Sequence, residues 1–183
     1  MYLKICDPNP EFKITREDSL ACNNLIQSSF PEIDFQGRDY FKQPPHYRIL
    51  AKENNKLIGQ IGLDYREMSL DGNPIKILGV IDICVDSKYR NKGVGKTLLK
   101  KAADLSLEFS DKIDFIFLVT NIPNYFSKYG FEKIEPTTTW LKIHQHKNYG
   151  LGTEKINDTN FMIKPINDKK WEGENLDLLG YMY

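Results

Sequence analysis

One short segment carries the residues best suited to chemistry. It spans Val85–Leu99 and reads VDSKYRNKGVGKTLL, so an apolar run leads into a basic turn with two glycines, Gly93 and Gly95. The first N–H groups of a helix have no partner inside the helix, and with the helix dipole they attract anions. Glycine in such a turn lets a ligand approach the backbone closely. The segment therefore predicts an anion-binding site.

The charge around this turn supports the same prediction. Between Asp86 and Lys101 the chain carries six cations and one acid, a local charge of +5. The whole chain has 25 Lys and Arg against 25 Asp and Glu, and its net charge is zero. A phosphorylated small ligand explains a local excess in a neutral protein, and the neutrality argues against a nucleic-acid-binding protein. The alternative is a solvated, lysine-rich start of a helix.

Three phosphate-binding motifs compete for this turn. Gly95-Lys96-Thr97 matches the end of a P-loop, but Arg90 stands where the first glycine of that motif belongs. Gly93-x-Gly95 matches the start of a dinucleotide fingerprint, but Leu98 replaces its third glycine. The pattern that fits without a defect is Arg90-x-x-Gly93-x-Gly95.

With this pattern the chain resembles the GNAT family of acyl-CoA-dependent N-acyltransferases, from about residue 47 to residue 131. The motif core is Ile83-Cys84-Val85-Asp86 followed by the Arg-x-x-Gly-x-Gly turn. A second element, Asn124–Phe131, is similar to the family's helix that ends in Gly-Phe. The resemblance implies an α/β (α+β) GNAT fold, with a mixed, mostly antiparallel sheet of six to seven strands flanked by about four helices. It implies acetyl-CoA as cosubstrate. His144 and His146 would share one face of a strand, but no third ligand is evident, so no metal is expected.

The resemblance also assigns positions to the cofactor. It places acetyl-CoA in an opening between the strands expected at 75–85 and 113–119. Backbone at Ile83 and Val85 would bind the pantetheine arm, and the turn with Lys96 would bind the phosphates. The assigned cofactor contacts are Ile83, Cys84, Val85, Arg90, Asn91, Lys92, Gly93, Val94, Gly95, Lys96, Asn121 and Phe126.

Acetyl transfer to an amine needs a base, because a free ammonium has a pKa of roughly 10.4. Asp82 is the first candidate, since it interrupts an apolar run, and burial there would raise its pKa toward neutrality. A structural hydrogen bond is the alternative role. Asp64, Glu67 and the terminal carboxylate of Tyr183 are further candidates. The backbone N–H of Val85 is the expected oxyanion donor.

The acid that protonates the leaving thiolate departs from the family pattern. The family has a Tyr four residues before the Gly of Gly-Phe, and here that position is Phe126. Tyr125 lies one step, about 100°, around the helix, and Tyr129 lies three residues beyond Phe126. Either reaches the site only if the helix is rotated, so packing is the alternative for both. Water can replace the acid, which leaves the reaction itself in place.

The segment 171–183 resembles the closing segment of two GNAT branches, the aminoglycoside N-acetyltransferases and the nodulation N-acyltransferases. This likeness favours an amino sugar or aminoglycoside as the acceptor. The alternative is a tail that packs on the core through Trp171, Leu176 and Leu179. Acids in the loop after the first helix (Glu32, Asp34 and Asp39) and in the tail would favour a cationic amine if both line the acceptor side.

The elements that position these residues follow from periodicity. Val94, Leu98, Ala102 and Leu105 recur at helical spacing, and Thr15 with Asp18 marks the start of a helix that ends before Pro31. A short helix is expected within 32–45 and another at 123–129. The strands are expected at 2–6, 47–51, 57–65, 75–85, 113–119, 140–144 and 161–166.

Length and composition bound the remaining questions. The 183 residues suffice for a single domain over 1–183, and no apolar run reaches the roughly 20 residues of a membrane span. The N-terminus has no secretory pattern, and Cys6, Cys22 and Cys84 are widely spaced, so we expect a cytoplasmic protein. A homodimer is the default expectation. Two alternatives to the enzyme stay open, a catalytically silent acyl-CoA-binding module and an ATP-binding protein.

Overall fold

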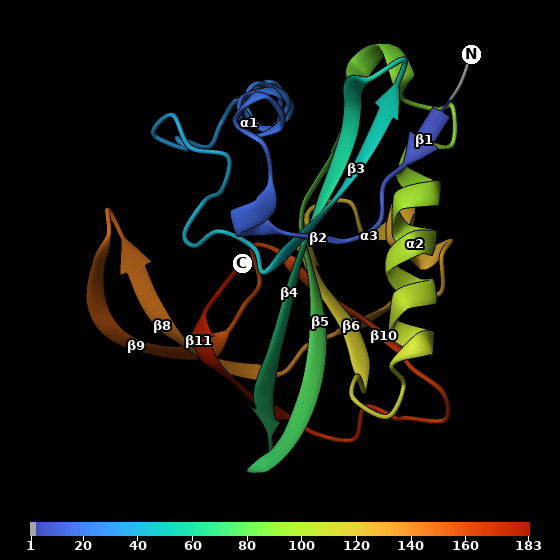
Figure 1. Ribbon diagram of the computed structural model, residues 1–183. Coiled ribbons are helices and arrows are strands. Elements are labelled where there is room, and N and C mark those ends of the chain that lie inside the picture. The colour runs from blue at the N-terminus through green and yellow to red at the C-terminus, as the bar shows by residue number, and fades with distance from the viewer. Residues whose placement is uncertain (1–2) are drawn as a thin grey trace. The chain divides into compact units, whose positions relative to one another are not determined.

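The computed structural model describes residues 3–183, which form two compact units (Figure 1). The first contains residues up to 64 together with 80–104, and the second contains 65–79 and 105–183. In chain order the elements are β1 (Leu3–Ile5), β2 (Asn9–Pro10), the 3-10 helix η1 (Glu11–Lys13), α1 (Arg16–Ser29), β3 (Tyr47–Glu53), β4 (Lys56–Leu70), β5 (Asn73–Val85), the 3-10 helix η2 (Ser87–Tyr89), α2 (Val94–Glu108), β6 (Phe115–Thr120), α3 (Pro123–Ser127), β7 (Glu132–Ile134), β8 (Thr137–His144), β9 (Lys147–Lys155), β10 (Asn160–Pro165) and β11 (Asn175–Tyr181).

The first unit is built on the antiparallel pair β3–β4, with β1 and β2 added to β3. Helix α1 begins where expected, because the Thr15 hydroxyl accepts the N–H of Asp18 at 3.1 Å and caps the helix. Figure 1 shows α1 and α2 on opposite sides of β3. Cys22 of α1 packs with Leu50 and Leu57 on one side. The two helices therefore cover different faces of this part of the sheet.

Gly59 explains how closely α2 approaches β4. A Cβ at Gly59 would lie 3.1 Å from Val94 Cγ1 and 3.3 Å from Leu98 Cδ1, so a larger residue would push these two side chains back by a few tenths of an ångström. The next positions with the opposite orientation along β4, Gln60 and Gly62, face the α1 side instead. One face of the strand is thus apolar and close-packed, and the other carries polar groups.

The second unit contains the strand order β7-β10-β6-β5-β4-β11-β8-β9. The β5–β6 pair is parallel and joins Ile77–Gly79 to Phe115–Phe117, and the β11–β8 pair is also parallel. Its core is rich in aromatic side chains, with Phe117 and Phe161 centroids 5.5 Å apart. The sheet is therefore mixed.

The α/β class with a mixed sheet is confirmed, but the sheet is larger than expected. Eleven strands are assigned in residues 3–183, against the six or seven expected. Strand β9 was missed because its sequence, KNYGLGTEK, is polar and glycine-containing, with no alternation. The short helix expected within 32–45 is wrong, since the structure has only turns and bends there. The described residues form three α-helices and two single-turn 3-10 helices, not four regular helices.

None of the helices in the described part of the chain is both long enough and apolar enough to cross a membrane. The expected strand at 2–6 is observed as β1, and Tyr2 lies outside the described residues.

Candidate functional site

The turn after β5 is shaped by side chains at its two ends. The Asp86 carboxylate accepts the N–H of Lys88 at 2.9 Å and starts η2. Arg90 Nε donates to the carbonyl oxygen of Val85 at 3.0 Å. The Arg90 side chain therefore also holds the end of the strand, besides its expected role toward phosphate.

Two residues of this turn have left-handed backbone, Asn91 with a φ of 60° and Gly93 with a φ of 84°. Alternation of left-handed and ordinary backbone turns successive N–H groups toward one point, which makes an anion-binding concavity. A Cβ at Gly93 would meet nothing within 4 Å, so space is open beside the backbone. Helix α2 begins at the next residue, Val94, whose side chain is buried. The backbone is therefore the part of Gly93 and Val94 available to a ligand.

The cations of the segment divide into two groups. Lys100 pairs with Asp104, and Lys101 pairs with Asp7 at 2.7 Å. These two charges are committed to the helix surface, so the local charge of +5 overstates the field at the turn. The charges that remain beside the turn are Lys88, Arg90, Lys92 and Lys96, all of them exposed.

Strand β5 is irregular at Asp82, whose φ of 48° is unusual inside a strand. The Gln60 amide donates to the Asp82 carbonyl oxygen, and Gln60 Nε2 lies 3.7 Å from Cys84 Sγ. Burial raises the pKa of the Asp82 carboxyl to about 6, with Arg48 opposing the rise and Asp39 adding to it. Asp82 therefore changes protonation state near pH 6, and at neutral pH its carboxylate can accept a proton from an amine.

Cys84 is unsuited to nucleophilic chemistry. Its side chain is buried, and this burial raises the pKa of the thiol to about 12. The thiol therefore stays protonated near neutral pH. Only its backbone is available for the cofactor contact that the resemblance assigns to it.

A buried network on the α1 side of the strands was not predicted from the sequence. Arg48 is 1% exposed and donates to both carboxylate oxygens of Glu11, at 2.8 and 2.9 Å. It also donates to Gln60 Oε1 at 2.9 Å and to the Asp39 carbonyl at 3.1 Å. The Asp39 carboxylate accepts from Ser19 Oγ. Asp39 therefore has structural partners in this network through both its carbonyl and its carboxylate.

A second pair of polar side chains joins His46, the residue before β3, to Asp64 of β4. His46 Nδ1 and Asp64 Oδ1 are 2.5 Å apart, with the His46 side chain 56% exposed and that of Asp64 only 3% exposed. Asp64 was an alternative candidate for the base. The structure gives it a histidine partner that no sequence motif indicated.

In the second unit, α3 carries the predicted acid. Phe126 is buried and packs edge-on against Phe131, with the centroids 5.8 Å apart. Tyr125 lies against Tyr129 with a centroid distance of 5.2 Å, and burial raises the pKa of Tyr125 to about 12, with a contribution from its hydrogen bond to Tyr129. Asn121 is exposed just after β6.

The tail packs on the second unit through its aromatic residues. The Trp171 ring lies 5.6 Å from Phe115, and Leu176 is buried as expected. The expected contact of Leu179 is wrong, because Leu179 is 59% exposed and Leu178 is buried instead. The positive φ of Leu179 turns its side chain outward.

The ring of Tyr183 packs on the second unit. An added Cβ at Gly79 would lie 2.0 Å from the Tyr183 hydroxyl oxygen, so this glycine makes room for the phenol on β5. The guanidinium of Arg66 lies 4.5 Å from the ring centroids of both Tyr181 and Tyr183. The end of the chain is thus held on the sheet.

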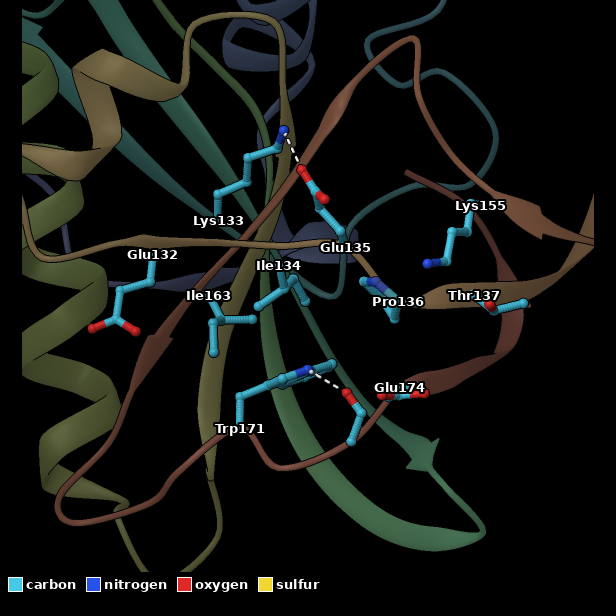
Figure 2. A pocket seen from close by; sticks show the side chains of 11 residues that line it. Glu132, Lys133, Ile134, Glu135, Pro136, Thr137, Lys155, Ile163, Trp171 and Glu174 are labelled. Atoms are coloured by element: carbon cyan, nitrogen blue, oxygen red, sulfur yellow. Dashed lines mark hydrogen bonds and ion pairs between the residues drawn. The ribbon is translucent and has the colours of Figure 1, made fainter.

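A pocket of about 450 Å³ lies in the second unit (Figure 2). Trp171 Nε1 donates to the Gly173 carbonyl within it, and Lys133 pairs with Glu135 at 2.7 Å. It contains none of the predicted site residues. Its lining is Glu132, Lys133, Ile134, Glu135, Pro136, Thr137, Lys155, Ile163, Trp171, Gly173 and Glu174.

Known proteins share sequence features with this chain. Residues 14–131 match the model of the acetyltransferase (GNAT) family. The chain is 24% identical over 156 residues to the L-amino acid N-acetyltransferase AaaT of Escherichia coli strain K12, a match that covers 83% of this chain and 88% of that protein.

Solved structures share the architecture. The GNAT family N-acetyltransferase YhbS of Escherichia coli, solved in complex with CoA, matches with a TM-score of 0.60 and 15% identity, over 96% of this chain and 88% of that chain. A protein of Enterococcus faecalis V583 named "Probable N-Acyltransferase" matches with a TM-score of 0.58 and 13% identity, over 74% of this chain and 33% of that one. The chain therefore spans about a third of the latter's length. At these identities the structural likenesses show the fold alone.

Proposed function

The chain belongs to the acetyltransferase (GNAT) family, and on that premise we propose that it transfers the acetyl group of acetyl-CoA to the primary amine of a small molecule. The observation that carries the proposal is the turn after β5, with left-handed Asn91 and Gly93 ahead of α2. Its N–H groups suit the pyrophosphate of CoA. The exposed Lys92 and Lys96 would add charge.

The donor would be held mainly by backbone. In the proposal, backbone at Ile83 and Val85 binds the pantetheine arm, and the Val85 N–H stabilises the oxyanion of the tetrahedral intermediate. The amine attacks the thioester carbonyl carbon directly in a ternary complex. The C–S bond then breaks and CoA leaves as a thiolate.

Asp82 is the proposed base. Its pKa of about 6 leaves it ionised at pH 7–8 yet basic enough to accept a proton from the reacting nitrogen. Asp82→Asn keeps the size of the side chain and removes the basic oxygen. We expect a loss of roughly 100-fold in kcat.

Protonation of the leaving thiolate does not depend on a side chain in this proposal. Tyr125 stays protonated at neutral pH, but with a pKa of about 12 it gives its proton reluctantly to a thiolate. We propose that Tyr125 contributes little and that water protonates the sulfur. Tyr183 is kept as an acceptor-side residue.

Two acceptor classes follow from different observations. The tail favours an amino sugar, whereas the name of the Escherichia coli relative specifies an L-amino acid. The structure gives the Trp-x-Gly pattern a packing role, since a Cβ at Gly173 would lie 2.5 Å from Leu70 Cγ. This reduces the weight of the tail, so we place L-amino acids first and amino sugars second. The cysteines are free thiols, which supports the expected cytoplasmic setting.

The test is release of CoA thiol from acetyl-CoA in the presence of the L-amino acids, glucosamine and kanamycin, each assayed alone. Saturable release with one class supports the proposal and identifies the acceptor. A melting shift with acetyl-CoA but no release with any amine would favour a silent acyl-CoA-binding module, for which the buried Phe126 is the supporting feature. Absence of any shift with acetyl-CoA would contradict the donor site itself.

A further inference from the structure

The proton balance of the proposed reaction leaves one proton without a route. An ammonium acceptor loses two protons as it becomes an amide. The proton that Asp82 accepts returns through water to the sulfur of CoA, and the other has to reach bulk water. Asp82 can hold only one proton at a time, so it cannot take both. A second proton acceptor with access to water would complete the balance.

The pair His46–Asp64 in the first unit has the geometry of such an acceptor. Asp64 Oδ1 lies 2.5 Å from His46 Nδ1, and the carboxylate is 3% exposed. A buried carboxylate on Nδ1 fixes the proton there and leaves Nε2 as the basic nitrogen. The His46 side chain is 56% exposed, so the imidazole is open to solvent.

The pair also lies beside the irregular part of β5. Gln60, Gly62 and Asp64 follow one another on the same face of β4. Gln60 contacts the Asp82 carbonyl, and a Cβ at Gly62 would lie 2.8 Å from Ile81 Cγ1 and 3.2 Å from Pro45 Cβ. These three residues of β4 therefore connect the neighbours of His46 to the neighbours of Asp82 within the same unit.

Gln60, Gly62 and Asp64 lie on the face of β4 opposite α2. Gly59 and the start of α2 occupy the other face, and the turn proposed to bind the CoA phosphates precedes α2. An acceptor that approaches the same strands from the side away from the donor phosphates meets the His46 face. In the loop that ends at His46, Phe35 is 2% exposed and packs in a cluster with Ile26 of α1 and Cys84 of β5.

We propose that His46, oriented by Asp64, is a catalytic base that takes one proton from the acceptor ammonium and releases it to water. The Nε2 lone pair of His46 forms the new N–H bond, the amine nitrogen keeps the electron pair of the broken bond, and the imidazolium then gives the proton to solvent. Asp64 orients the imidazole and acts as a positioning residue. The inference rests on the acetyl transfer proposed above.

A purely structural pair predicts different behaviour. Asp64 is buried, and a buried carboxylate needs a partner whether or not the partner takes part in catalysis. A structural His46 would therefore affect stability and leave turnover per folded molecule unchanged. A catalytic His46 would affect turnover even in fully folded protein, and free imidazole would restore part of it.

The experiment uses His46→Gln and His46→Ala in the full chain, with acetyl-CoA and the amine that the wild-type protein acetylates fastest in the panel above. For His46→Gln we expect a loss of roughly 100-fold in kcat with the acetyl-CoA melting shift unchanged. For His46→Ala we expect saturable recovery with added imidazole. Asp64→Asn should give an intermediate loss that imidazole does not restore.

His144→Gln is the matched control, because His144 is exposed on the β8–β9 hairpin and belongs to neither pair nor turn. It should match the wild type. Wild-type kcat in folded His46→Gln, or no response of His46→Ala to imidazole, overturns the role of His46 and leaves the acetyltransferase proposal standing. Failure of every amine with wild-type protein contradicts the acetyltransferase proposal first.

Discussion

Two regions of the first unit contrast in how they are built. The turn at 86–96 is largely exposed, is made from consecutive residues, and offers backbone N–H groups. The second region, which we call the polar row, is the network of Arg48 with its partners Glu11, Gln60 and Asp39 around β3 and β4. It is largely buried, and its residues lie far apart in the chain, with Arg48 and Glu11 separated by 37 positions. The turn has open space beside Gly93, whereas Arg48 is enclosed by its partners.

This difference determines which substitutions each region tolerates. A backbone site depends on the conformations its residues allow, so it tolerates changes in exposed side chains. A buried polar network depends on every partner being present, because an unmatched buried charge is costly. Substitutions in the row should therefore act on stability and proton transfer, and substitutions in the turn should act on donor binding.

Arg48→Met tests the strongest claim about the row. Removing the guanidinium leaves Glu11 and Gln60 without their buried donor, and we expect a loss of about 3–5 kcal/mol in the free energy of unfolding, measured with urea. Lys52→Met is the control on the same strand, since its pair with Asp18 is partly exposed and should contribute below about 1 kcal/mol. Equal effects of the two variants would contradict the contrast between buried and exposed pairs.

Asp82→Asn tests how the protonation of Asp82, which lies on β5 beside the polar row, affects stability. Asp82 binds its proton more tightly in the folded state, with a pKa of about 6 against the ordinary 3.8. Protonation therefore stabilises the fold below pH 4, and this contribution is lost as the pH rises from 4 to 6. An asparagine cannot ionise, so above pH 7 the variant should gain up to roughly 3 kcal/mol relative to its difference from wild type at pH 4.

Urea titrations of both proteins at pH 4 and pH 8 measure this gain. A difference between variant and wild type that does not change with pH would mean that Asp82 is not shifted in the folded state. That result would remove the physical reason for choosing it as the base.

The same contrast explains what the sequence allowed us to predict. The turn was predictable because Arg90, Gly93 and Gly95 lie within six residues, and the fold class followed from hydrophobic periodicity. The row was not, because its members meet only in the folded chain, as Arg48 and Gln60 do when β3 and β4 align with Arg48 opposite Gly62. Asp64 drew notice as an acid, but nothing local linked it to His46. Strands β7, β9 and β11 were missed because they are short, polar or irregular, and pairing with neighbours fixes them.

Gly93→Ala tests the claim that the turn works through its backbone. Gly93 and Gly72 both have a φ of 84°, and an added Cβ meets nothing within 4 Å at either position. Both alanine variants should therefore lose about 1–2 kcal/mol of stability. Only Gly93→Ala should also weaken acetyl-CoA binding, by at least about 10-fold or 1.4 kcal/mol, in calorimetric titration. Equal donor affinity in the two variants would place the phosphates elsewhere.

Lys96→Gln gives the smallest and sharpest comparison within the turn. If backbone N–H groups carry the binding, removal of one exposed ammonium should weaken acetyl-CoA affinity by only about 0.5–1 kcal/mol, and high salt should abolish the difference. Lys100→Gln is the matched control one helical turn later, because Lys100 is paired with Asp104 and should not respond to the donor. A loss of 100-fold in Lys96→Gln would instead mean that a side chain holds the phosphates. The turn would then depend on its side chains, as the buried row does.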